Sequence, residues 1–155
     1  MRSGGFVPAS FAVPDGLAGP AFRLVPLGPE HNVADHRAWT SSIEHIRATP
    51  GFQEGAWPPV DGMTLEENLG DLTKHAGEFV RREAFTYTVL APDSDTVIGC
   101  LYIYPSKRPG IDAKIRSWVR AADAALDPVL YHVVTDWLAT TWPFQGIEYA
   151  ERPGV

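Results

Sequence analysis

Three stretches of the chain repeat hydrophobic residues at the spacing of an α-helix. The clearest follows Thr64-Leu65-Glu66-Glu67, a capping box in which the hydroxyl and the carboxylate each accept a hydrogen bond from a backbone amide. The apolar positions after it form one stripe: Leu65, Leu69, Leu72, Ala76, Phe79 and Val80. The sequence therefore predicts a helix from residue 65 to residue 80.

The two other helical stretches flank this one in the sequence. We expect the first to begin with Asp35 as its N-cap and to end at Thr49-Pro50-Gly51, since a proline pushes the residue before it out of the helical region. Its common face contains Trp39, Ser42, Ile43 and Ile46. We expect the other to begin at Asp127-Pro128, where aspartate suits the N-cap and proline the first helical position. Its apolar stripe consists of Leu130, Val133, Val134, Trp137 and Leu138.

β-Branched and aromatic residues predict strands at 22–27, 85–90, 97–104, 111–121 and 146–150. The polar segment 91–95 is a hairpin loop, so the strands on either side of it should be antiparallel. In the strand 111–121, period-two alternation assigns Ile115, Ser117 and Val119 to one face and Arg116, Trp118 and Arg120 to the other. A helix separates the last two strands, so these two should be parallel.

The resulting order, β-α-α-β-β-β-α-β, predicts an α+β (mixed α/β) fold with a mostly antiparallel sheet flanked by helices. Residues 1–21 are rich in glycine and proline, and we interpret them as an N-terminal arm with a short strand at Phe11-Ala12-Val13. Residues 22–155 are interpreted as a single domain. Because proteins usually cover exposed sheet edges, we expect the arm or a second subunit of a homodimer to cover the edge at Tyr149.

Composition narrows the class of protein without indicating an activity. The 155 residues, 45% hydrophobic and 21% charged, are typical of one globular domain. A net charge of -6 and the lack of a basic run argue against nucleic-acid binding. No apolar run is long enough for a membrane helix or a signal peptide, and the single cysteine, Cys100, cannot form an intrachain disulfide. We therefore expect a cytoplasmic protein that does not bind membranes.

Three short segments resemble the GNAT (Gcn5-related N-acetyltransferase) superfamily. Phe22 to His31 is similar to the opening strand and the start of the first helix, and Val97-Ile98-Gly99-Cys100 is similar to the third strand. Ala113-Lys114-Ile115-Arg116-Ser117-Trp118-Val119 resembles the fourth strand of the ribosomal-protein acetyltransferase branch. The resemblance covers residues 22 to 150 and includes the order of the elements.

This resemblance implies acetyl-CoA as cofactor, held in a gap between the last two predicted strands. Its pantetheine would pair with backbone groups of the strand 111–121, and its pyrophosphate would lie at the N-terminus of the following helix. The residues of this chain at those positions are Trp118, Val119, Arg120 and Ala125. The chain differs from the family in having no glycine from Ile111 to Gln145, with Asp123 where the family has the first glycine of its pyrophosphate loop. As the predicted N-cap, Asp127 would occupy the amides that a pyrophosphate needs.

The acceptor would be an amine of a small molecule or a peptide. In the family the first helix lines the acceptor site, so Glu44 and His45 are candidates for the general base, against the alternative that both are solvated surface groups. The aromatic residues assigned to a substrate pocket are Trp39, Trp57, Tyr87 and Tyr102, with Tyr104 beside them. The histidines lack metal-ligand spacing, so no metal is expected. Two functions remain open: an N-acetyltransferase, or a GNAT-like domain that no longer uses acetyl-CoA and binds a small ligand or a protein.

Overall fold

The computed structural model describes residues 5–153 and is built around one six-stranded sheet with the strand order β1-β2-β3-β4-β5-β6. The strands are β1 (Leu17–Ala18), β2 (Arg23–Pro26), β3 (Phe85–Leu90), β4 (Val97–Pro105), β5 (Ala113–Val119) and β6 (Ile147–Tyr149). Each strand pairs with the next in sequence, and all pairs are antiparallel except β5 with β6. The predicted mixed sheet and its parallel last pair are confirmed.

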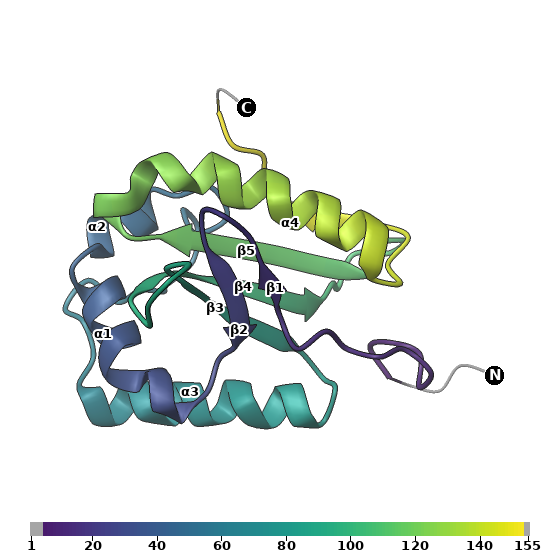
Figure 1. Cartoon of the computed structure of the whole chain (residues 1–155), viewed down its shortest axis with the longest axis horizontal. Coiled ribbons are helices and arrows are strands. Elements are labelled where there is room, and N and C mark those ends of the chain that lie inside the picture. The colour runs from purple at the N-terminus through teal and green to yellow at the C-terminus, as the bar shows by residue number, and fades with distance from the viewer. Residues whose placement is uncertain (1–4, 154–155) are drawn as a thin grey trace.

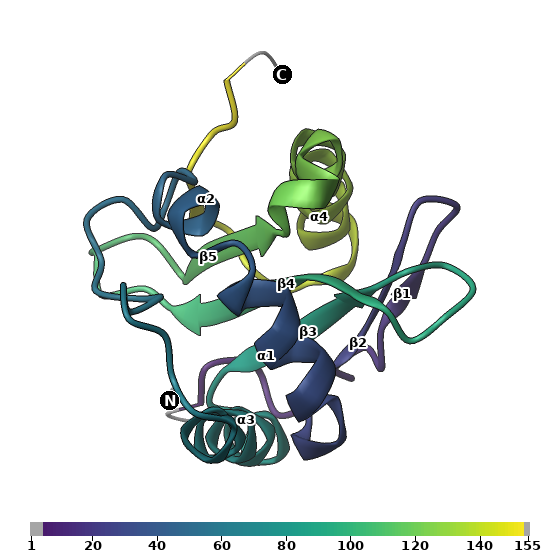
Figure 2. The same cartoon turned by 90° about the vertical axis from the view of Figure 1, so that its left-hand side faces the viewer.

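Helices cover both faces of this sheet, as Figure 1 shows, with α4 along one side and α3 along the other. A 3-10 turn, η1 (Pro29–His31), leads into α1 (Asn32–Thr40) and α2 (Ile43–Arg47), and the long helix α3 (Leu65–Val80) follows a loop. A second 3-10 segment, η2 (Ala121–Leu126), runs into α4 (Asp127–Thr141). The view in Figure 2 shows that α1 and α2 lie on the side of the sheet away from α4.

Each face of the sheet has its own hydrophobic core. On the α4 face, Phe85, Tyr87, Val89, Leu101 and Ile103 pack with Leu130, Val134 and Trp137. On the α1 and α3 face, Trp39, Ile46, Phe52, Leu72, Tyr102 and Trp118 form the second core. The division follows from strand periodicity, because successive side chains of β3, β4 and β5 point to opposite faces.

The N-terminal arm packs against the first of these cores. Arg82 donates hydrogen bonds to the carbonyls of Pro8 (2.8 Å) and Phe11 (2.9 Å), and the Tyr87 hydroxyl donates to Pro14 O (2.6 Å). The short strand of the arm is β1, so the expected strand at Phe11-Ala12-Val13 is wrong. β1 pairs with β2, at the opposite edge from β6, so within residues 5–153 the arm does not pair with the β6 edge. A homodimer contact there stays a prediction, and the part of the arm formed by residues 1–4 lies outside the described residues.

Two details of the helix predictions need correction. Asp35 is not an N-cap, because the helical region begins earlier, at Pro29, and leaves Asp35 buried inside α1.

The capping box of α3 is confirmed, with Thr64 Oγ1 accepting from Glu67 N at 3.0 Å and Glu67 accepting from Thr64 N at 2.9 Å. Its apolar stripe is buried only in part, since Leu65, Leu69 and Val80 are 45%, 40% and 81% exposed. Within residues 5–153, no helix is both long enough and apolar enough to cross a membrane.

Candidate functional site

A cavity of about 240 Å³ lies between the sheet and the helices α1 and α3, and we call it the aromatic cavity. One side of it consists of Tyr102 and Tyr104 on β4 and Arg116 on β5. The other side is formed by α1, α3 and the loop after α2, through Asp35, Asn68, Asp71, Leu72, Lys74, His75, Phe52 and Trp57, with Leu27. Aromatic walls with a few polar groups are typical of small-ligand sites.

Trp57 is central to the aromatic wall. Its ring lies 6.0 Å from that of Phe52, 6.3 Å from that of Tyr102 and 6.1 Å from that of Trp118, measured between centroids. The Trp118 indole N–H donates to the Tyr102 hydroxyl at 3.0 Å, which fixes the Tyr102 ring against the floor of the cavity. These contacts make the aromatic wall rigid, because each ring is held from at least two directions.

A buried polar network closes the α1–α3 end of the cavity. The Asn68 amide donates to Asp35 Oδ2 (3.1 Å) and to Asn32 Oδ1 (2.8 Å), while its carbonyl accepts from the Trp39 indole N–H (2.9 Å). Asp35 is 4% exposed, and burial raises its pKa to about 6 because the charged form is poorly solvated. This carboxyl group is thus half-protonated near pH 6 and mostly ionised at pH 7, so at neutral pH it can accept a proton from a ligand.

His75 on α3 faces the same space. Its Nδ1 lies 3.3 Å from the Thr86 hydroxyl, 3.4 Å from the Tyr104 hydroxyl and 3.6 Å from Glu78 Oε1. Burial lowers the pKa of the His75 imidazole, although the Glu78 carboxylate acts in the opposite direction. The neutral imidazole is therefore favoured, and it provides one proton acceptor or donor beside Tyr104.

Arg116 forms part of the wall between the aromatic cavity and a more open groove of about 800 Å³ along β5 and β6. Its guanidinium carbon lies 5.0 Å from the Phe52 ring centroid and 5.8 Å from that of Tyr102. Its Nε is buried without a hydrogen-bond partner. No residue in the described range 5–153 forms an ion pair with Arg116, so its guanidinium is held by cation–π contacts with the two rings.

The second notable region lies beyond the end of the β5–β6 pairing, and we call it the β5–β6 gap. β5 pairs with β6 only through Ala113, Ile115 and the residue between them, so the later backbone of β5 has no strand partner on this side among residues 5–153. Arg152, which is 4% exposed, fills that space. Its Nη2 donates to Ser117 O at 2.7 Å and to Ser117 Oγ at 3.2 Å, and its Nε donates to Asp127 Oδ2 at 2.7 Å.

Further contacts secure the filling of the gap. Arg152 Nη1 donates to Ala150 O (2.8 Å) and Pro50 O (3.2 Å), which connects the C-terminal segment to the loop after α2. The Tyr149 hydroxyl lies 2.6 Å from Ser117 Oγ, and burial raises the pKa of Tyr149 to about 12. As arranged here, the gap does not fit acetyl-CoA, because the Ser117 carbonyl that would face the pantetheine already accepts a hydrogen bond from Arg152.

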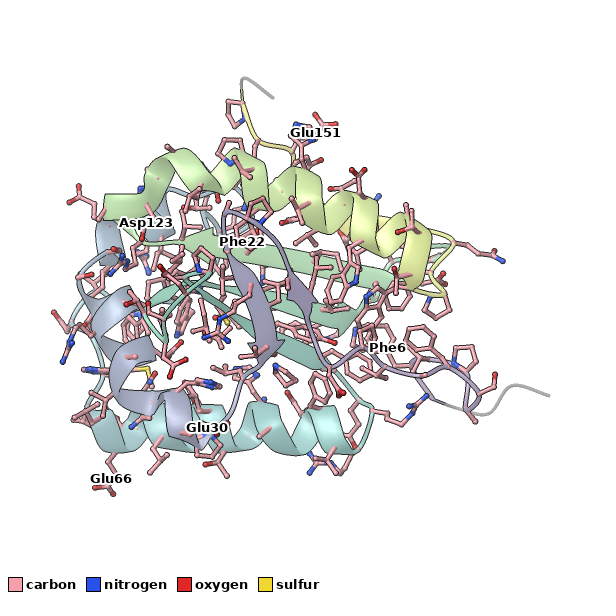
Figure 3. All side chains as sticks on the ribbon, viewed as in Figure 1. Phe6, Phe22, Glu30, Glu66, Asp123 and Glu151 are labelled. Carbon is pink, nitrogen blue, oxygen red and sulfur yellow. The ribbon has the colours of Figure 1, made fainter. Side chains whose placement is uncertain are left out.

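The segment after β5 is also satisfied internally. Arg120 Nε and Nη2 lie 2.7 Å from Asp123 Oδ2, and the backbone N–H of Ala121 donates to Ser42 Oγ at 2.8 Å. Figure 3 shows Asp123 at the end of the η2–α4 segment that is closer to α2. The prediction that Asp127 caps α4 is wrong: η2 precedes it, the N-cap position falls on Leu126, and the Asp127 carboxylate pairs with Arg152 instead.

The structure separates the four residues that the resemblance assigned to the cofactor. Trp118 and Val119 are buried on opposite faces of the sheet, Trp118 beside Trp57 and Val119 in the α4 core. Arg120 forms its ion pair with Asp123, and Ala125 is exposed in η2. None of the four lines the aromatic cavity.

The predicted acceptor residues are separated as well. Trp57 and Tyr102 line the aromatic cavity, and Trp39 lies behind it, 5.4 Å from Trp57 between ring centroids. Tyr87 is not among them: it pairs with Leu101 across β3 and β4 and therefore lies on the α4 face, opposite Tyr102. Glu44 and His45 line a shallow pocket beside Ala121 and are not part of the aromatic cavity.

Several cavity and gap residues were missed by the sequence analysis, namely Asp35, Asn68, His75, Arg116 and Arg152. Only Arg116 carried a signal, as a charged residue on the same predicted strand face as Trp118. The others come from distant segments that only the tertiary fold brings together. In residues 5–153 no group of three or more His, Cys, Asp or Glu side chains is arranged to hold a metal ion.

Comparison with known proteins relates this fold to acetyltransferases. No protein-family model matches the chain, and no curated protein matches it in sequence. Among solved structures, a Vibrio cholerae protein assigned as a ribosomal-protein-serine acetyltransferase superposes with a TM-score of 0.69 at 12% identity, over 92% of this chain and 78% of that one.

Two further solved structures contain coenzyme A or a derivative. RimJ from Mycobacterium smegmatis in complex with CoA-disulfide has a TM-score of 0.63 at 17% identity, over 90% of this chain and 67% of its own. The microcin C7 self-immunity acetyltransferase MccE, in complex with acetyl-CoA and AMP, has a TM-score of 0.62 at 10% identity, over 82% and 66%. The chain therefore has the fold of the GNAT acetyltransferases, as its sequence resemblance implied.

Proposed function

We propose that this protein is an N-acetyltransferase that binds acetyl-CoA by displacing Arg152 from the β5–β6 gap, and that it accepts a small amine in the aromatic cavity. The observation that carries the proposal is the early end of the β5–β6 pairing beside that cavity. A GNAT fold binds its cofactor where these two strands separate, and Arg116, the residue next to Ser117, reaches the cavity wall. Acetyl-CoA supplies the acetyl group when bound.

The volume of the cavity supports a small acceptor. About 240 Å³ is near the lower end of the range for ligand pockets and suits a molecule of amino-acid size. Four groups in its wall have altered pKa values: burial raises those of Asp35, Tyr102 and Tyr104 and lowers that of His75. The two tyrosines keep their protons, which leaves the Asp35 carboxyl group and the neutral His75 imidazole as proton acceptors. Such groups are candidates for accepting the proton that an amine loses on acetylation.

Closure of the gap favours a second candidate, a GNAT-fold module that binds a ligand without acetyl-CoA. Arg152 occupies Ser117 O, Ser42 occupies the Ala121 amide, and Asp123 occupies Arg120. Each of these three groups therefore has a partner within the chain. The two candidates therefore differ in one property, which is whether acetyl-CoA displaces Arg152.

Calorimetric titration with acetyl-CoA distinguishes them. The acetyltransferase proposal expects binding to the unaltered protein, tighter binding to Arg152→Met, and acetylation of a panel of small primary amines. Arg108→Met is a matched control, since Arg108 pairs with Glu148 at the surface and leaves the gap unchanged. If neither the unaltered protein nor Arg152→Met binds acetyl-CoA at millimolar concentration, the acetyltransferase proposal is wrong and the module stands.

A further inference from the structure

The other half-buried or buried arginines of the described chain have polar partners, which makes Arg116 different. Arg23 pairs with Asp95, Arg120 with Asp123 and Arg152 with Asp127. Arg47 and Arg82 donate to backbone carbonyls. Within residues 5–153, Arg116 has no hydrogen-bond or ion-pair partner, and its Nε is buried.

A buried donor of a cationic group at the wall of a cavity needs an explanation when it has no acceptor, because such a donor lowers stability. The rings of Phe52 and Tyr102 hold the guanidinium in place without using its hydrogen-bond donors. A guanidinium presents paired N–H donors in one plane, an arrangement that matches the two oxygens of a carboxylate. Arg116 is thus positioned with its donors still available for a ligand.

We infer that the aromatic cavity binds a small molecule with a carboxylate, that Arg116 holds this carboxylate, and that the hydrophobic part of the ligand packs on Trp57 and Phe52. The inference rests on the proposed function only in treating this ligand as the acceptor amine. A carboxylate is favoured over a phosphate because one unpaired cation balances one negative charge. Asp35 and Asp71 in the same wall would repel a second negative charge.

The acidic groups on the opposite wall complete the description of the ligand. Asp71 and Asp35 line the cavity from α3 and α1, whereas Arg116 lines it from β5. Lys74 also lines the α3 wall, but its ammonium pairs with Glu78 at 3.4 Å. A molecule with an amine and a carboxylate therefore finds unpaired charges of opposite sign on opposite walls. The substrate class that this arrangement selects is an amino-acid-like amine with an apolar side chain.

The test is calorimetric titration of the protein, without acetyl-CoA, against three matched probes: L-phenylalanine, phenylacetate and phenethylamine. We expect the two carboxylates to bind and Arg116→Met to weaken both at least 10-fold, while the affinity for phenethylamine changes less than 2-fold. Arg116→Lys should weaken them less, since it keeps the charge but loses the paired donors. Arg108→Met, a basic residue of the neighbouring groove, should leave all three affinities unchanged.

Equal affinities of Arg116→Met and the unaltered protein for phenylacetate would overturn the inference, as would tighter binding of inorganic phosphate than of either carboxylate. Circular dichroism of Arg116→Met establishes that the variant folds, and Arg116→Lys serves as the test if it does not. Carboxylate binding without acetyl transfer would overturn the proposed function and leave this inference intact. Acetylation of phenethylamine with the same kcat/KM as L-phenylalanine would overturn this inference and leave the proposed function intact.

Discussion

Two arginines near the same strand experience opposite environments. Arg152 fills the β5–β6 gap with an ion pair to Asp127 and hydrogen bonds to the carbonyls of Ser117, Ala150 and Pro50. Arg116 lies at the aromatic cavity between two rings, with no polar partner in residues 5–153. Arg152 therefore stabilises the fold through its polar contacts, whereas the donors of Arg116 are free of polar contacts within residues 5–153. On this basis we propose that the gap stabilises the fold and that the cavity binds the ligand.

The largest expected effect is the loss of the Arg152 side chain. Arg152→Met leaves the half-buried Asp127 without its cation and Ser117 O without its donor, which should lower the free energy of unfolding by about 3 kcal/mol. Urea unfolding monitored by circular dichroism measures the change. The double variant Arg152→Met/Asp127→Asn should recover part of the loss, because no unpaired charge remains. A loss below about 1 kcal/mol would mean that the gap does not depend on Arg152.

A second test compares the half-buried carboxyl group of Asp127 in the gap with the buried carboxyl group of Asp35 in the cavity. Asp127 has Arg152 as partner, whereas Asp35 has only the Asn68 amide and a pKa raised from 3.8 to about 6. The unfolded chain binds this proton less tightly than the folded one. The stabilisation from protonated Asp35 is therefore fully present below about pH 4 and is lost as the pH rises through 6.

Asp35→Asn should remove this dependence on pH. The shift of about two pKa units corresponds to about 3 kcal/mol, by which the unaltered protein should lose stability between pH 4 and pH 7 relative to the variant. Urea unfolding across this pH range measures both slopes. Parallel slopes for the two proteins would show that Asp35 titrates at the same pH in the folded and unfolded chain.

A third test removes a hydrogen bond near the β5–β6 gap without removing a charge. Ser42→Ala deletes the hydroxyl that accepts from the Ala121 amide, and it should lower stability by about 1 kcal/mol. Because that amide lies at the start of η2, the affinity for acetyl-CoA should rise at the same time. Thr40→Ala is the matched control, since the Thr40 hydroxyl donates to His36 O within α1. Similar acetyl-CoA affinities for the two variants would contradict a role of the amide.

The smallest expected change in stability belongs to Arg116. Arg116→Met removes cation–π contacts but no hydrogen bond or ion pair, so the free energy of unfolding should change by less than about 1 kcal/mol. Carboxylate binding should nevertheless be lost. If Arg116→Met instead destabilised the protein as much as Arg152→Met, the contrast between the two arginines would not hold.

Local sequence signals predicted the elements of the fold well. The capping box at Thr64 and Glu67 satisfies amides within one turn, and the turn after β3 needs only neighbouring residues, so both are visible in the sequence. Asp127 was misjudged for a complementary reason. An aspartate before a proline favours an N-cap locally, but Arg152, 25 residues further along the chain, provides a stronger partner.

The site was harder to predict because it joins segments that are distant in sequence. The sequence analysis assigned Trp57, Tyr87 and Tyr102 to one substrate pocket. Only the register of β3 against β4 shows that Tyr87 and Tyr102 lie on opposite faces of the sheet. Asp35, Asn68 and His75 look like ordinary polar residues of helices. Their burial depends on how α1 and α3 pack over the sheet, which no local pattern specifies.

Arg116 separates the aromatic cavity from the groove along β5 and β6, since its side chain lines both. A rotation of this one side chain would change the shape of both. A ligand that drew the guanidinium into the aromatic cavity would thus enlarge the groove along β5 and β6. Binding in one space would change the shape of the other without movement of the backbone.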